Sequence, residues 1–147
     1  MGKKYIHYGH KKFDRSTFRF VKNRWGFTKP CGGLWASPVD AEFGWKNWND
    51  SEHFCECCEE NSFTFSLREN AQVITIRSVE EAKLLPMACY PEFHFDLWIT
   101  PDFEKLEDLG YDAIEIVLSA DWRLYQTLYG WDCDSILVLN PEVIVSD

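Results

Sequence analysis

Two stretches near the middle of the chain alternate apolar and polar residues in the way that half-buried β-strands do. They are SFTFSL at residues 62–67 and AQVITI at residues 71–76, with a turn-like segment between them, and they predict a pair of strands. A short helix is expected next, because Ser78 and Glu81 have the spacing of a capping box and Pro86 ends the segment. Short strands followed by short helices predict an α+β fold, rich in strands, with the helices packed at the edges of the sheet.

The remaining segments indicate the same fold class. Strands are predicted at residues 3–9, 111–119 and 134–145, the last turning at Asn140 and Pro141, and helices at residues 101–110 and 120–130, each ending at a glycine. No linker, low-complexity segment or internal repeat divides the sequence. At 147 residues the chain is long enough to bury a core of its own, and we expect one domain over residues 1–147.

The segment KPCGGLWASPVDAEFGW, residues 29–45, places two glycines and a tryptophan just before a predicted helix. The Gly32–Gly33 pair allows a tight turn, because glycine adopts backbone conformations that other residues avoid. Ser37 is a suitable N-cap and a proline follows it at the first helical position, so a helix is expected over residues 38–48. Trp35 therefore lies between a flexible turn and the start of a helix.

Charge is unevenly distributed along the chain. The net charge of −9, from 24 acidic and 15 basic side chains, disfavours nonspecific binding of nucleic acid, which depends on Lys and Arg displacing counterions. The first 25 residues are nevertheless basic, which indicates a local anion site. Arg15, Arg19 and Arg24 are candidates to bind a diphosphate there, because an arginine fork matches phosphate oxygens.

Cysteine usage and hydropathy indicate the setting of the protein. No signal peptide and no apolar run of bilayer length is visible, so a cytoplasmic protein with reduced thiols and no membrane partner is expected. His53, Cys55, Cys57 and Cys58 are too closely spaced to enclose one tetrahedral zinc ion, which uses separated pairs of ligands. A thiol cluster without metal is the favoured interpretation, and a zinc site completed by a distant cysteine is the alternative.

Three short motifs, far apart in the sequence, carry the functional signal. They are IHYG with His7, GGLWAS with Trp35, and DCDSILVLNPEVI with Asp134. In this order, and on the predicted elements, they resemble the ADP-ribosyltransferase superfamily of the diphtheria toxin and poly(ADP-ribose) polymerase type, its small bacterial or phage members in particular. The resemblance implies a split β-sheet core and NAD as the substrate, surrounded by an early histidine, a central aromatic residue and a late acid.

The resemblance also implies a role for each motif residue. His7 would bind ribose hydroxyls, and Gly9 would let the backbone approach the carboxamide. Trp35 stands where the family has a tyrosine that walls the nicotinamide pocket, and Phe43 or Trp45 would supply the second face of an aromatic stack. The expected NAD-binding set is completed by Tyr8, Gly33 and Ser37. The alternative that Trp35 is a core residue stays open, since seven tryptophans can also form an unusually heavy core.

The chemistry of this class needs a carboxylate. Cleaving the bond between nicotinamide and ribose builds positive charge on the ribose, and a nearby carboxylate stabilises that charge. Asp134 is the first catalytic candidate, although it is one methylene shorter than the glutamate that is usual in the family. Glu115 on the neighbouring strand is the second candidate, but its position also suits a solvent-facing strand residue. Asp132 is a third acid close by.

We therefore expect a mono-ADP-ribosyltransferase that releases nicotinamide from NAD and passes ADP-ribose to a macromolecule, a protein rather than a nucleic acid on grounds of charge. The resemblance implies the biological role of a toxin or a phage effector. Three alternatives stay open. They are a nucleotide-binding or interaction module of the same fold with little or no activity, an NAD glycohydrolase that transfers to water, and a zinc-organised interaction module.

Overall fold

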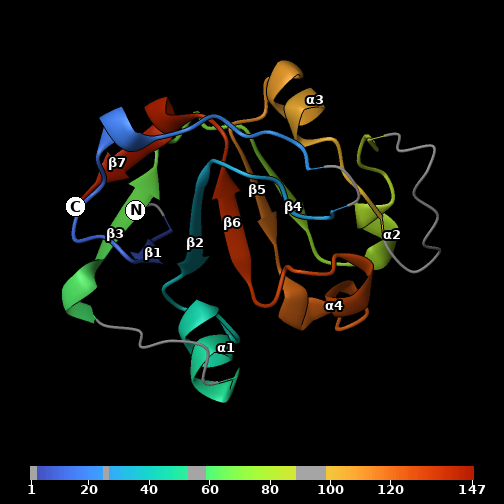
Figure 1. The fold of residues 1–147 in the computed structure, drawn as a ribbon, viewed down its shortest axis with the longest axis horizontal. Helices are drawn as coiled ribbons and strands as arrows, with labels where there is room; N and C mark the ends of the chain where they lie inside the picture. Colours follow the sequence, from blue (N-terminus) through green and yellow to red (C-terminus); the bar gives the residue numbers. More distant parts are fainter. Residues whose placement is uncertain (1–2, 25–26, 53–58, 89–98) are drawn as a thin grey trace.

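A computed structural model of the chain describes residues 3–24, 27–52, 59–88 and 99–147 and shows a mixed α+β fold built on one seven-stranded sheet (Figure 1). The strands are β1 (Tyr5–Tyr8), β2 (Leu34–Pro38), β3 (Ser62–Leu67), β4 (Val73–Ile76), β5 (Ala113–Ile116), β6 (Ser135–Val138) and β7 (Ile144–Ser146), in the spatial order β4-β5-β6-β2-β1-β3-β7. The helices are α1 (Trp45–Glu52), α2 (Val79–Ala82), α3 (Phe103–Asp108) and α4 (Leu124–Thr127). The α+β class is as predicted.

The two central strands, β1 and β2, are paired over a short length. Their antiparallel ladder consists of Tyr5 opposite Pro38 and Ile6 opposite Ser37. Beyond it, β1 continues to pair with β3 as far as Tyr8, while β2 pairs with β6 from Ala36 back to Leu34. The sheet therefore opens at its centre, between a part made of β1, β3 and β7 and a part made of β2, β6, β5 and β4.

Two hydrophobic clusters cover the two faces of the sheet. Along β6, Leu137 belongs to one cluster and Ile136 and Val138 to the other, because successive strand residues point to opposite faces. The first cluster is closed by the short helices α2, α3 and α4, which Figure 1 shows around the β4–β5–β6 part of the sheet. The second contains Tyr5 and Phe65 from β1 and β3. Because this second cluster also contains Ile136 and Val138 from β6, it spans both parts of the sheet.

The two alternating stretches of the sequence form strands that are not neighbours. β3 covers the predicted residues 62–67 and lies between β1 and β7, whereas β4 lies at the opposite edge, parallel to β5. The chain leaves β3 with the Arg68 N–H bonded to the Val143 carbonyl and enters β4 with the Gln72 N–H bonded to the Asp112 carboxylate. These two long-range hydrogen bonds hold the ends of the connecting segment at opposite parts of the sheet. β3 and β4 therefore do not pair with each other.

The helix predicted over residues 38–48 is wrong in its start. β2 extends to Pro38, and α1 begins only at Trp45. Ser37 still caps a helix, because its Oγ accepts the Trp45 N–H at 2.8 Å, but it does so across the loop between the two elements. Phe43 consequently lies in that loop and not on the helix.

The other capping predictions are confirmed. The Ser78 Oγ accepts the Glu81 N–H at 3.1 Å at the start of α2, and Gly110 and Gly130 follow α3 and α4 with positive φ angles. The last predicted strand is divided in two, because a 3₁₀ turn over Pro141–Val143, capped by Asn140, separates β6 from β7. Within the described ranges, the helices are all too short or too polar to cross a bilayer.

Candidate functional site

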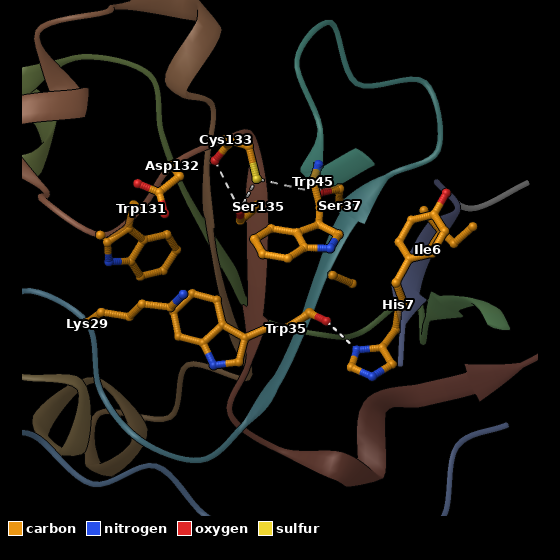
Figure 2. A pocket seen from close by; sticks show the side chains of 13 residues that line it. Ile6, His7, Lys29, Trp35, Ser37, Trp45, Trp131, Asp132, Cys133 and Ser135 are labelled. Atoms are coloured by element: carbon orange, nitrogen blue, oxygen red, sulfur yellow. Dashed lines mark hydrogen bonds between the residues drawn. The ribbon is translucent and has the colours of Figure 1, made fainter. Parts of the chain in front are cut away.

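A cavity of about 190 Å³ lies where the β1–β2 ladder ends (Figure 2). It collects side chains from both central strands, from the start of α1 and from the segment that leads into β6. We call it the first cavity. Its lining residues are Ile6, His7, Tyr8, Lys29, Trp35, Ala36, Ser37, Trp45, Gly130, Trp131, Asp132, Cys133 and Ser135.

Three tryptophans give the first cavity its aromatic walls. The Trp35 and Trp131 rings meet edge to face, with centroids 4.7 Å apart, and Trp45 stacks on Trp48 at 4.9 Å. The Trp35 indole donates to the Gly32 carbonyl at 3.1 Å, and the buried Trp131 indole donates to the Thr28 carbonyl at 3.0 Å. Because main-chain acceptors hold these two rings, the walls are fixed before any ligand arrives.

The two glycines of the segment are required by the backbone that positions Trp35. Gly32 and Gly33 have φ angles of +82° and +71°, a region that L-residues with side chains rarely adopt. A Cβ on Gly33 would lie 2.4 Å from the Leu137 Cδ1, and one on Gly32 would lie 2.5 Å from the Phe20 carbonyl oxygen. The tight turn expected from the sequence is thus present, and it packs closely against β6.

His7 bridges the opening in the sheet. Its Nδ1 donates to the Trp35 carbonyl at 2.6 Å, which continues the contact between β1 and β2 past the end of the ladder. Its Nε2 lies 3.0 Å from the Nδ1 of His10, and the two rings stack. Burial lowers the pKa of His7, the bond to Trp35 opposes this, and His10 lowers the pKa further. A neutral ring fits both contacts, with Nδ1 as donor and Nε2 as acceptor.

A second cavity, of about 290 Å³, shares His7 with the first. Its lining also includes two basic residues, Lys12 and Arg19, together with His10 and one acidic residue, Asp14. The other arginines proposed from the sequence are engaged elsewhere. Arg15 pairs with Glu142 at 3.1 Å, and the Arg24 guanidinium lies 4.2 Å over the Phe27 ring.

The two acids predicted to be catalytic are buried away from both cavities. Asp134 is 3% exposed, and its carboxylate accepts the N–H and the hydroxyl of Ser119, each at 2.7 Å, and the Phe43 N–H at 3.3 Å. Glu115 is 4% exposed and accepts the Tyr5 hydroxyl at 2.7 Å and the Lys3 ammonium at 2.6 Å. Burial, with the adjacent Glu115, raises the pKa of Tyr5. These carboxylates tie elements of the fold together.

The first cavity instead holds the third acid noted in the sequence, Asp132, and polar residues to which the sequence analysis gave no role. Asp132 and Lys29 line it, and the pKa of Lys29 is lowered by burial, an effect that the charge of Asp132 opposes. The Cys133 thiol lies 3.3 Å from the Ser135 Oγ, and burial raises its pKa. Cys133 and Ser135 line the cavity, whereas Asp134, which lies between them in the sequence, does not.

The structure brings part of the predicted site together. His7, Tyr8, Trp35, Ser37 and Trp45 line the first cavity, Gly33 lines the second, and Gly9, Phe43, Asp134 and Glu115 line neither. Gly9 has a φ of +119° and donates its N–H to the Asn61 carbonyl. The His53, Cys55, Cys57 and Cys58 cluster lies outside the described residues. Among the residues that are described, no three His, Cys, Asp or Glu side chains gather as a metal site would require.

Comparisons with protein-family models, with curated proteins and with solved structures gave no match. The functional interpretation therefore depends on the geometry of the two cavities and on the sequence motifs that meet there.

Proposed function

We propose that the protein is a mono-ADP-ribosyltransferase that binds NAD across the two cavities and transfers ADP-ribose to a macromolecular acceptor, a protein on grounds of charge. One observation carries this proposal. His7, Trp35 and Trp45, from three separated parts of the chain, line one cavity at the opening of the sheet. The sequence resemblance assigns two of these positions, the histidine and the central aromatic residue, to the NAD site.

The shape of the site suits an elongated ligand with one aromatic cationic end. A nicotinamide ring is planar and cationic in NAD, and tryptophan faces attract such rings. Neither cavity alone reaches the roughly 300–1,000 Å³ that is typical of small-molecule sites, so a dinucleotide would have to extend past His7 into the second cavity. There Lys12 and Arg19 offer cations to the diphosphate.

Asp132 is the acid best placed for the chemistry. In the transfer, the bond between nicotinamide and ribose breaks, its electron pair leaves with nicotinamide, and the acceptor attacks the positively charged ribose carbon and loses a proton. A carboxylate in the cavity wall stabilises that charge. Asp132 lines the first cavity, whereas the carboxylates of Asp134 and Glu115 are filled with hydrogen bonds elsewhere. We therefore assign to Asp132 the role that the motif suggested for Asp134.

The proposal is tested by incubating the purified protein with labelled NAD and a cell lysate, and by measuring nicotinamide release and labelled protein. We expect both signals, and we expect Asp132→Asn to lower nicotinamide release about 100-fold, the usual cost of losing one electrostatic stabiliser. Asp108→Asn is the matched control, because it removes the same charge from an exposed residue at the end of α3. Nicotinamide release that is equal in all three proteins would refute the role of Asp132.

A second candidate, a nucleotide-binding module without transfer, is favoured by one specific observation. Asp134, the acid that the motif designates, does not line the cavity. Its neighbours Cys133 and Ser135 line it, but they carry no carboxylate. Calorimetric NAD binding without nicotinamide release would support this candidate. Release of free ADP-ribose without labelled protein would instead indicate an NAD glycohydrolase.

A further inference from the structure

Lys29 places an ammonium group at the wall of the first cavity. Its Nζ lies 4.4 Å from the centre of the Trp35 ring, and Figure 2 shows its side chain reaching toward that indole. The backbone around it is anchored, because the Thr28 hydroxyl donates to the Tyr129 carbonyl and the Thr28 carbonyl accepts the Trp131 indole N–H. Pro30, on the other side, is buried. The position of the ammonium is therefore set by the fold.

This ammonium has few partners of its own. With the residues that the structure describes, Lys29 forms no hydrogen bond and no ion pair within 4 Å, and its close contact is the face of Trp35. Burial is the main reason why its pKa is lowered, and the charge of Asp132 compensates only in part. A cation that has lost water without gaining an anionic partner is stabilised by any anion that enters the cavity.

The position of Lys29 also limits which ring can stack on Trp35. A pyridinium ring that lay against this indole would carry a positive charge next to the ammonium, and like charges repel strongly where water is excluded. A carboxylate on the ring, or a phosphate attached to it, would remove that conflict by pairing with the ammonium. The cavity therefore discriminates between ligands by their negative charge as well as by their aromatic rings.

We propose that the first cavity is an aromatic site selective for an anionic ligand, in which Lys29 binds a carboxylate or phosphate oxygen of a molecule that stacks among Trp35, Trp45 and Trp131. This inference depends on the proposed function in one respect, namely that the ligand is a pyridine nucleotide. For such a ligand the oxygen belongs either to the carboxylate of the deamidated, nicotinic acid form or to the 5′-phosphate of the nucleotide.

The test compares three ligands by isothermal titration calorimetry. Nicotinamide riboside has neither anionic group, nicotinamide mononucleotide adds the phosphate, and nicotinic acid riboside adds the carboxylate. We expect at least one of the two anionic ligands to bind at least ten times more tightly than nicotinamide riboside. A preference for the mononucleotide identifies the phosphate as the bound group, and a preference for the acid riboside identifies the carboxylate.

Variants of Lys29 show whether this residue causes the preference. Lys29→Met keeps an apolar stem beside Trp35 and should fold, which circular dichroism and thermal unfolding will verify. It should abolish the preference for the anionic ligand and bind nicotinamide riboside more tightly than the unaltered protein does, because the ammonium that repels the pyridinium ring is gone, whereas Lys29→Arg should retain the preference. Lys22→Met, at an exposed lysine outside both cavities, is the matched control and should behave like the unaltered protein.

The outcomes separate this inference from the proposed function. If the unaltered protein and Lys29→Met bind all three ligands with equal affinity, the anion selectivity is refuted while NAD binding stands. If the same loss of preference appears in Lys22→Met, the effect comes from overall charge and the assignment to Lys29 is refuted. If neither NAD nor any of the three ligands binds, the proposed function and this inference are both wrong.

Discussion

The two sides of the chain where it enters β6 differ in how completely their polar groups are satisfied. On one side, the Asp134 carboxylate accepts three hydrogen bonds from Ser119 and Phe43 and is almost entirely buried. On the other side, Cys133 and Ser135 contact mainly each other and face a cavity. Adjacent residues thus have two different roles. Asp134 stabilises the fold through its hydrogen bonds, whereas Cys133 and Ser135 line the cavity that a ligand can enter.

The same contrast holds between two charged side chains of opposite sign, the buried Glu115 and the half-buried Lys29. Glu115 has the Tyr5 hydroxyl and the Lys3 ammonium as partners, whereas Lys29 has the face of an indole. A buried charge with its hydrogen bonds made is explained by the fold alone. A partly desolvated charge without such hydrogen bonds is stabilised by a partner from outside the chain. In this protein, a charged group that lacks hydrogen-bond partners is therefore a better indicator of the ligand site than a buried acid.

The largest expected effect is on stability, from Asp134→Ala. Removing this carboxylate leaves the partly buried Ser119 and Phe43 N–H groups and the Ser119 hydroxyl without their acceptor, which should lower the free energy of unfolding by about 3 kcal/mol. Urea unfolding followed by tryptophan fluorescence measures the loss. Unchanged stability together with lost nicotinamide release would show that Asp134 is not a structural residue. It would then have the catalytic role expected from the motif.

A smaller effect is expected from the next residue along the chain, in Ser135→Ala. The Ser135 Oγ donates to the Cys133 carbonyl at 3.0 Å beside the cavity, where water can replace it, so the free energy of unfolding should fall by about 1 kcal/mol or less. NAD affinity, measured by calorimetry, should change more than stability does. A loss of stability equal to that of Asp134→Ala would show that both sides of β6 are structural.

Local patterns in the sequence were enough to predict several elements. The alternation of SFTFSL places β3 at the predicted residues, and the capping box at Ser78 gives the start of α2, because each depends only on neighbouring residues. The early histidine, which lies on a strand that the pattern also predicted, and the central tryptophan, which lies on a strand that the pattern did not predict, line one cavity.

Other features depend on contacts that no local pattern reveals. β6 is apolar on both faces, so its alternation does not tell which way Asp134 points. Ser37 caps α1 across a loop, and Lys29 reaches the cavity because its neighbour Thr28 is bonded to residues about a hundred positions later. The unsatisfied ammonium that defines the proposed anion site was therefore visible only once the chain had folded.

The smallest expected effect concerns His7, whose neutral ring satisfies both of its ring nitrogens. Burial lowers its pKa in the folded protein below the usual value of 6.5, so below that pH the unfolded chain binds more protons than the folded one. Stability should therefore be complete above about pH 6.5 and decrease as the pH falls toward 5. His7→Gln, which can still donate to the Trp35 carbonyl, should flatten this decrease in unfolding experiments at several pH values.

The other three histidines are common to both proteins, so the difference between the two curves isolates His7. Parallel curves would show that protonation of this ring does not oppose folding, and that His7, like Asp134, is fully accommodated by its neighbours.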